Sequence, residues 1–455
     1  MKDLLIVGGG PAGYAAAVRA AQLGMQVALV EREALGGTCL NWGCIPTKVM
    51  YEAACLKKNI KKAAGYGLNA GEPVFNAKTL IDKRNQIVHG LRDGIAGLLR
   101  KYSVEVLQGS FSFQNGAAAI DGRAYSAAKV LLACGAKDDM PVFPGCELPE
   151  VISSKQLLLR DSMPQRLVIY GGGVAGAEFA SIFATLGCDV SIVKTGKRFF
   201  PFMDDEIDKR IPTYLKRCGV QLQTGMRLKQ TIKRGSLFKC IFEDITRDSI
   251  MELETEALLI TKGRIANTDS LGLASSGIET DARGFITVDA DYQTTRRDIF
   301  AVGDVTGKRM LAHAASEEAV TAVERMTGMD SSVNYDAIPN CVFMFPQVAS
   351  VGRSEQEAAA QGILGGCGKF MFSGLGRAQT TGEIDGFVKT ICDQSGRIIG
   401  VHMIGPEVSE LVACAATALH TKMSAEKFSK IVQAHPTLAE SLRESAQDVL
   451  HRGIQ

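Results

Sequence analysis

The sequence of 455 residues has little of several features that mark specialised classes of protein. Its 51 Lys+Arg nearly balance its 49 Asp+Glu, so the net charge of +2 attracts neither nucleic acid nor an anionic membrane. Its 12 cysteines are too sparse for a disulfide scaffold. No apolar run approaches the ~20 residues that a membrane span needs. Tryptophan occurs once, as Trp42.

The first residues lack the features of a targeting segment. Met1-Lys2-Asp3 leads directly into apolar residues 4–7, a run too short for the core of a signal peptide. We therefore expect a soluble, cytoplasmic protein with no membrane or nucleic-acid partner. Because thiols stay reduced in that compartment, a disulfide would be catalytic rather than structural.

The 48 glycines are unevenly spread, and two of their clusters mark an internal repeat with copies at residues 4–31 and 166–194. Each copy reads as a buried strand, a Gly-x-Gly-x-x-Gly turn, a helix of small residues and a second apolar strand. The first glycine permits the tight turn, the second lets the backbone approach a pyrophosphate, and the third lets the helix pack on the strand. These glycines are Gly8, Gly10 and Gly13 in the first copy, and Gly171, Gly173 and Gly176 in the second. Two such turns in matching frames predict two dinucleotide-binding domains, whereas glycines that only punctuate turns are the weaker alternative.

The remaining pattern predicts an α/β fold: two Rossmann-like dinucleotide-binding domains and a C-terminal α+β domain. Residues 50–110 look helical and then β-rich, and short strands alternate from about 220 to 260. An apolar strand then ends in Gly303-Asp304, and strands followed by helices begin at Cys341.

Two cysteines, Cys39 and Cys44, directly follow the first copy of the repeat. Five positions apart, they can lie about one helical turn from each other, close enough for a disulfide. A disulfide in so small a loop removes little unfolded-state entropy, so a reversible redox pair explains it better than stabilisation. Zinc binding is the main chemical alternative, but no Cys/His pair with the spacing of zinc ligands accompanies the two cysteines. The other alternative is that they are two unrelated buried thiols. The other cysteines, Cys55 and Cys414 among them, occur singly in apolar stretches, where burial is expected.

Residues 36–48 resemble the redox-active disulfide motif of the pyridine nucleotide–disulfide oxidoreductases, and the resemblance extends over the whole chain. It includes the helix at 15–24, the segment Met310-Leu311-Ala312-His313 and the segment at 434–440. The helix and the Leu-Ala-His segment favour the lipoamide branch of the family. The resemblance therefore implies oxidation of dihydrolipoamide through a Cys39–Cys44 disulfide and FAD, with reduction of NAD. The alternatives are an NADPH-dependent reductase of another disulfide, such as glutathione, and a non-catalytic flavoprotein.

The same resemblance implies the domains and partners of the chain. It assigns 1–145 to the first part of the FAD-binding domain and 146–268 to the nicotinamide nucleotide-binding domain. It assigns 269–338 to a central FAD-binding segment and 339–455 to the dimerisation domain. We expect a homodimer that acts on a lipoyl-carrying protein of a 2-oxo-acid dehydrogenase or glycine-cleavage system. No metal is implied.

The FAD site is carried over residue by residue. Glu31 would bind the adenosine ribose, Lys48 would lie near flavin N5 and pair with Glu178, and Asp304 would contact the ribityl–phosphate region. Without the resemblance, Lys48 reads as an exposed lysine and Glu178 as an acid in the first turn of a helix. The implied FAD residues are Gly8, Gly10, Gly13, Glu31, Gly37, Thr38, Lys48, Gly109, Gly135, Asp304 and Ala312.

The resemblance also implies the catalytic groups. Cys39 would exchange with the substrate, Cys44 would lie nearest the flavin, and His435 would deprotonate the incoming dithiol, since the thiolate is the nucleophile. Glu440 would orient His435. Thr437 to Glu440 is also a capping-box pattern, in which Glu440 would satisfy the Thr437 amide; the two roles are compatible.

One departure concerns the second nucleotide site. Lys194 stands where an acidic residue usually holds the ribose 2′-hydroxyl, and with Lys197 and Arg198 it could meet a 2′-phosphate. Gly176 retains the last glycine typical of the NAD branch, so NAD is favoured and NADP is the alternative. The implied nucleotide residues are Gly171, Gly173, Gly176, Glu178, Lys194 and Gly263.

Overall fold

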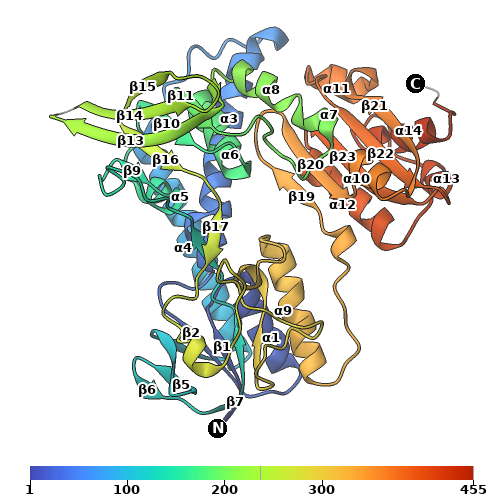
Figure 1. Ribbon diagram of the computed structural model, residues 1–455. Helices are drawn as coiled ribbons and strands as arrows, with labels where there is room; N and C mark the ends of the chain where they lie inside the picture. The colour runs from blue at the N-terminus through green and yellow to red at the C-terminus, as the bar shows by residue number, and fades with distance from the viewer. Residues whose placement is uncertain (236, 454–455) are drawn as a thin grey trace.

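Three large β-sheets organise the computed structural model, which describes residues 1–235 and 237–453. In Figure 1 the sheet with the N-terminal strand lies at the bottom, the second lies above it, and the third, coloured orange to red, lies to the right. The first two are parallel and the third is antiparallel. This arrangement confirms the predicted α/β fold with two Rossmann-like units and a C-terminal α+β unit.

The first sheet has the strand order β18 (Ile299–Ala301), β7 (Ala127–Leu132), β1 (Lys2–Val7), β2 (Val27–Glu31), β3 (Glu105–Gln108). Residues 4–7 of strand β1 are apolar without a break, because both faces of the strand are covered there. Leu4 and Ile6 pack toward helix α1 (Pro11–Gln22), whereas Leu5 and Val7 pack toward a small antiparallel sheet. That sheet consists of β4 (Phe111–Gln114), β5 (Ala117–Ile120) and β6 (Arg123–Ala124).

The second sheet repeats this plan with the order β12 (Gln221–Thr224), β11 (Asp189–Lys194), β10 (Arg166–Tyr170), β16 (Ala257–Ile260), β9 (Val151–Ile152). Leu167 and Ile169 pack toward helix α6 (Val174–Leu186), and Val168 and Tyr170 pack toward a second antiparallel sheet. That sheet consists of β13 (Met226–Arg234), β14 (Leu237–Asp244) and β15 (Ile250–Thr255). The two copies of the sequence repeat therefore fold alike.

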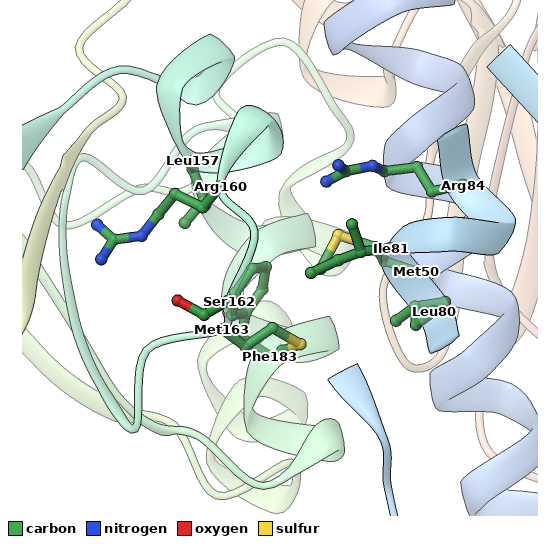
Figure 2. A pocket seen from close by; sticks show the side chains of 9 residues that line it. All are labelled: Met50, Leu80, Ile81, Arg84, Leu157, Arg160, Ser162, Met163 and Phe183. Atoms are coloured by element: carbon green, nitrogen blue, oxygen red, sulfur yellow. The ribbon is translucent and has the colours of Figure 1, made fainter. Parts of the chain in front are cut away.

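Long helices and a short two-stranded sheet join the first two units. Helix α3 (Cys44–Ala63) packs against both α4 (Ala77–Lys101) and α6, and β8 (Ala136–Asp138) pairs with β17 (Arg264–Ala266). A cavity of about 10 Å³ lies where α3 and α4 meet α5 (Ser154–Leu159) and α6, and Figure 2 shows the side chains that line it. There the guanidinium of Arg84 donates to the carbonyl oxygen of Leu158. The cavity has room for about one water molecule, so it is no substrate site.

The third sheet has the order β19 (Asn340–Val342), β20 (Gln347–Gly352), β23 (Ile398–Gly405), β22 (Phe387–Asp393), β21 (Leu364–Met371). Helices α12 (Val408–His420) and α14 (Glu440–Val449) pack on it through a shared apolar cluster. Within 1–235 and 237–453, no helix is long and apolar enough to cross a membrane.

The remaining helical elements lie beside or between these sheets. The helices are α2 (Gly37–Trp42), α7 (Asp205–Asp208), α8 (Ile211–Arg217), α9 (Ala312–Met326), α10 (Glu355–Ala360), α11 (Gly376–Thr381) and α13 (Ala425–Ser429). The 3₁₀ turns are η1 (Ala64–Tyr66), η2 (Ala274–Ser276), η3 (Gly303–Thr306), η4 (Tyr335–Ala337) and η5 (Phe372–Gly374).

A buried lysine joins the third sheet to the second unit. Lys389 of β22 is only 3% exposed, and its Nζ lies 3.1 Å from Asp204 Oδ1, 3.0 Å from Glu206 Oε1 and 2.5 Å from Glu355 Oε2. Burial by itself lowers the pKa of Lys389, but the three carboxylates outweigh burial and raise that pKa above its ordinary value. Burial raises the pKa of Glu206, and hydrogen bonds from Lys369 and Lys389 outweigh it, so the net shift is downward.

We expect Lys389→Met to lower the free energy of unfolding by about 3–5 kcal/mol, because it leaves the buried carboxylate of Asp204 unpaired. Lys369→Met is the matched control: Lys369 pairs with the same Glu206 but is 41% exposed, so its loss should cost about 0–1 kcal/mol. Urea denaturation of both variants measures the difference, and equal midpoints would contradict the role given to Lys389.

The stabilisation should also depend on pH. The stabilisation is present from about pH 4 to 10. Below that window it is lost as the pH falls through the lowered pKa of Glu206, and above the window it is lost as the pH rises through the raised pKa of Lys389. The destabilisation by Lys389→Met should therefore be largest inside that window.

Candidate redox and nucleotide-binding site

The two predicted redox cysteines form a disulfide at the junction of two helices. Cys39 lies on α2, Cys44 begins α3, and their Cα atoms are 4.6 Å apart. Gly43 permits this junction, because a Cβ atom there would lie only 2.8 Å from the carbonyl oxygen of Thr38. The pairing expected from the spacing is confirmed.

The other cysteines are free thiols. Cys240 and Cys392 are buried as expected, and burial raises the pKa of each to about 12. The expectation of burial is wrong for Cys414, which is exposed. Its helix α12 buries the stripe formed by Val412, Ala415 and their neighbours at helical spacing, and position 414 lies outside that stripe.

The glycine turns have the predicted backbone geometry. The first glycines, Gly8 and Gly171, have φ of +101° and +124°, which favours glycine. A Cβ atom on Gly13 would lie 1.8 Å from the carbonyl oxygen of Gly8, and one on Gly176 would lie 2.5 Å from that of Gly171. A Cβ atom on Gly173, in contrast, would meet nothing within 4 Å. The space before the middle glycine is therefore open at a helix N-terminus, which fits a pyrophosphate.

The first turn is joined by a second loop and by an acid. Glu31 ends β2, and its Oε2 accepts from the N–H of Gly9 at 2.7 Å. Gly37 has a φ of +57°, and a Cβ atom there would lie 2.7 Å from the Cα of Gly10. Thr38, the next residue, is exposed at this place. The narrow backbone cradle and the acid at the strand end fit the pyrophosphate and ribose of FAD.

Asp304 lies on η3, just beyond β18, and forms an ion pair with Arg264. Burial raises the pKa of Asp304, and the charge of Arg264 opposes that shift without cancelling it. The adjacent Gly303 N–H donates to Glu318 Oε2 at 2.8 Å. Sequence reasoning missed Arg264, because its partner is 40 positions away and no local spacing connects them.

Four further predicted positions lie on the connections between elements, three of them around the first sheet and Gly263 between β16 of the second sheet and β17. Gly109 follows β3 and donates its N–H to the carbonyl oxygen of Glu31 at 3.0 Å. Gly135 and Gly263 directly precede β8 and β17, and a Cβ atom on either would meet nothing within 4 Å. Ala312 begins α9. Gly135 and Gly263 thus leave open space beside the backbone, whereas at Gly109 a Cβ atom would lie 2.6 Å from Asp121 Oδ2.

The predicted Lys48–Glu178 pair is present and partly buried. Lys48 Nζ lies 3.0 Å from both carboxylate oxygens of Glu178, and the Glu178 side chain is 8% exposed. The N–H of Phe343 donates to Glu178 Oε1 at 2.8 Å, and Lys48 Nζ lies 4.4 Å from the centre of the Phe343 ring. The pair therefore joins α3, α6 and the end of β19, which rules out an unpaired surface lysine.

Glu440 makes both contacts that the sequence left open, but the predicted capping box is wrong: α14 begins at Glu440 with Ala439 as its N-cap, so Thr437 does not cap the helix. His435 Nδ1 lies 2.9 Å from Glu440 Oε1, and the N–H of Thr437 donates to Glu440 Oε2 at 2.9 Å. Burial raises the pKa of Glu440, but the Thr437 N–H and His435 outweigh it, and the net shift is downward. The His435 side chain is 71% exposed, so its ring is open to a reactant or to another subunit.

The side chain of Lys194 does not bind the glycine turn as that of Glu31 does in the first copy of the repeat. Its Nζ donates to the carbonyl oxygen of Arg198 and lies 4.0 Å from the centre of the Phe199 ring. Burial lowers the pKa of Lys194 to about 8. Its ammonium is therefore turned toward its own loop.

Two family descriptions match the chain. Residues 2–319 match the pyridine nucleotide-disulphide oxidoreductase family, and residues 338–446 match the dimerisation domain of that family. A dihydrolipoamide dehydrogenase from Chaetomium thermophilum is 38% identical over 100% of this chain and 92% of its own length. A dihydrolipoyl dehydrogenase from Chlamydia muridarum is 34% identical over 98% of this chain and 96% of its own length.

Solved structures share the fold as well. LpdA from Mycobacterium tuberculosis has a TM-score of 0.89 and 25% identity, and the match covers 98% of this chain and 99% of that one. The HOCl-induced flavoprotein disulfide reductase RclA from Escherichia coli has a TM-score of 0.86 and 27% identity, with coverage of 98% and 99%.

We expect the oxidised protein, unfolded in denaturant, to titrate ten free thiols with a colorimetric thiol reagent, since two of the 12 cysteines are bonded. Reduction before unfolding should raise the count to 12. A Cys39→Ser/Cys44→Ser variant should titrate ten thiols before and after reduction. Twelve thiols in the oxidised protein would contradict the disulfide.

Proposed function

The chain belongs to the pyridine nucleotide–disulphide oxidoreductase family, and on that premise we propose that it oxidises dihydrolipoamide and passes the electrons to NAD. It is a flavin disulfide oxidoreductase of the dihydrolipoyl dehydrogenase type. The observation that carries the proposal is the Cys39–Cys44 disulfide, which lies between the first glycine turn and the Lys48–Glu178 pair. The names of the curated relatives support dihydrolipoamide as the dithiol.

The cofactors of this family are FAD and NAD, and the two glycine turns are where we place them. FAD would be held by the first turn, Glu31, the 37–38 loop, Lys48 and Asp304, with Gly109, Gly135 and Ala312 around them. NAD would be held by the second turn, with Glu178, Lys194 and Gly263 nearby. When bound, FAD supplies the route by which an electron pair leaves the Cys44 thiolate for the nicotinamide.

The protein's own part in the reaction is a thiol–disulfide exchange. A thiolate of the substrate attacks Cys39 Sγ, the Cys39–Cys44 bond breaks, and Cys44 leaves as a thiolate. The second thiolate of the substrate then attacks the substrate sulfur that is bonded to Cys39 Sγ. The bond to Cys39 breaks, a cyclic disulfide of the substrate is released, and Cys39 leaves as a thiolate. One disulfide forms and one breaks, so the two electrons now reside on the cysteine pair.

We propose that His435 is the base that accepts the proton of the substrate thiol. Each attacking thiol must lose a proton, and the exposed imidazole can accept it at its free Nε2 side while Glu440 binds Nδ1. Glu440 is a positioning residue: it holds the imidazole and is itself held by the Thr437 N–H. Because His435 belongs to the segment that matches the dimerisation domain, we propose a homodimer in which His435 of the partner subunit serves each disulfide.

The proposed physiological partner is a lipoyl-carrying protein of a 2-oxo-acid dehydrogenase or glycine-cleavage system. The domain limits 1–145, 146–268, 269–338 and 339–455 also stay a proposal. The alternative function is an NADPH-dependent reductase of another disulfide such as glutathione. The likeness to a disulfide reductase favours testing it.

We expect the FAD-loaded protein to reduce NAD with dihydrolipoamide and to show no turnover with glutathione. Cys44→Ser should lower turnover below detection, because the disulfide cannot form, and should retain bound flavin by its absorbance. Cys414→Ser is the matched control, since it removes an exposed thiol on α12 that forms no disulfide, and its kcat should stay within about twofold of the wild type, as for a surface change. Full activity of Cys44→Ser would sink the mechanism.

The trans arrangement of His435 can be tested by mixing two inactive variants. His435→Gln and Cys44→Ser homodimers should each lose about 10²-fold or more in turnover, the usual contribution of a positioned base. A hybrid dimer keeps one intact site if the base acts across the interface, so a random equal mixture should recover about a quarter of wild-type activity. Absence of recovery in purified hybrids would show that each base serves its own subunit.

A further inference from the structure

The loop after β11 closes on itself rather than opening toward a nucleotide. Lys194 is buried, and its stem lies against the second glycine turn, since a Cβ atom on Gly172 would lie 2.8 Å from Lys194 Cδ. Its ammonium donates to the carbonyl oxygen of Arg198 and lies over the ring of Phe199. In the first copy, the residue at the corresponding strand end, Glu31, instead presents a carboxylate to the glycine turn. Lys194 thus tethers its own loop.

The guanidinium of Arg198 is already occupied by two carboxylates. Its Nη2 lies 2.6 Å from Asp205 Oδ1, and its Nε lies 3.2 Å from Asp208 Oδ2. The other oxygen of Asp208 accepts from the N–H groups of Phe199 and Phe200 at 2.8 and 2.5 Å. The loop that follows the nucleotide strand is therefore held by its own acidic turn, α7.

That acidic turn is held from its other side as well. Asp204 and Glu206 both pair with Lys389 of the third sheet, and Asp204 is fully buried. Asp205, which lies between them in sequence, is 45% exposed and pairs with Arg198. Because its neighbours are anchored, Asp205 is kept in place beside the guanidinium.

We infer that Asp205, by pairing with Arg198, determines the nucleotide selectivity of this protein: it withholds the guanidinium from a 2′-phosphate, so the site takes NAD. This inference rests on the proposed function and concerns the same nucleotide site. Arginine binds phosphate through the same donors that it uses for a carboxylate, so both cannot have the full set at once. A 2′-phosphate near Arg198 would also meet the negative charges of Asp205 and Asp208.

The three cations after β11 therefore do not make an NADP site. Lys194 is committed to a carbonyl oxygen of its own loop, and Arg198 is neutralised by its two carboxylates. Lys197 is the cation left over, and it makes no ion pair within 4.0 Å among residues 1–235 and 237–453. A single exposed lysine carries little weight against the two carboxylates, because solvent and salt screen it.

The test is Asp205→Asn in the FAD-loaded protein. Asparagine keeps the size of the side chain and removes one of the two negative charges that hold Arg198, leaving its contact with Asp208. We expect the ratio of kcat/KM for NADP to kcat/KM for NAD to rise about tenfold, the effect of one charge-assisted hydrogen bond. Binding of 2′,5′-ADP, measured by calorimetry without turnover, should tighten by a similar factor of about ten, and added salt should weaken the gain.

Two further variants show whether the gain runs through the arginine. Asp205→Asn/Arg198→Met should lose the gain in both the kinetic ratio and 2′,5′-ADP binding. Asp189→Asn is the control for net charge: Asp189 lies at the other end of the same strand, where its carboxylate accepts from the side-chain amide of Gln221 at 3.2 Å. It should leave the ratio within about twofold of the wild type, since distant surface charges are screened.

An unchanged ratio and unchanged 2′,5′-ADP affinity in Asp205→Asn would overturn the inference. So would a gain that survives Arg198→Met, or a wild-type protein that prefers NADP. The binding measurement separates this result from failure of the proposed function. If dihydrolipoamide proves not to be a substrate, 2′,5′-ADP affinity still shows whether Asp205 controls the site.

Discussion

An ion pair between Lys48 and Glu178 holds the reactive parts of this protein in register. A buried carboxylate is costly unless it is paired and fully hydrogen-bonded. Glu178 meets that requirement by accepting from Lys48 at 3.0 Å and from the Phe343 N–H at 2.8 Å. Lys48 lies four residues after Cys44 on the same helix, hence on the same face about one turn away. Satisfying one acid thus places the disulfide helix, the second nucleotide helix and the C-terminal unit relative to one another.

The acidic turn α7 is a second such joint. Asp204, which caps this turn, and Glu206 bind Lys389 of the third sheet. Asp205 and Asp208 bind Arg198 in the loop after β11. Because Lys389 is buried, water cannot replace the carboxylates that bind its ammonium. The turn that carries these acids is therefore held in place. The structure therefore connects the loop after β11 to the unit that matches the dimerisation domain through these charges, beside an apolar cluster that also spans the two units.

Local chemistry made much of the site predictable from the sequence. The glycine turns, the Cys39–Cys44 pair and the His435–Glu440 contact all lie within short stretches, where spacing restricts geometry. The Lys48–Glu178 pair spans 130 positions and was accessible only through the family resemblance.

What escaped prediction depends on long-range contacts between residues of ordinary type. Arg264 approaches Asp304, and Lys389 approaches Asp204, only after separate sheets have packed together. The basic run after β11 resembles a phosphate site in the sequence, because the sequence does not reveal that Asp205 pairs with Arg198. Cys414 looked buried because its apolar neighbours belong to the opposite side of its helix.

The central claim is that electrons pass from a dithiol to a nicotinamide through Cys39 and Cys44. Differential alkylation of the FAD-loaded protein, read by mass spectrometry, tests it most directly. Under anaerobic conditions, we expect dihydrolipoamide alone to increase the alkylation of these two cysteines and of no others. Subsequent addition of NAD should reverse that increase by reoxidising the pair. Reactivity that appears at other cysteines, or that NAD leaves unchanged, would contradict the claim.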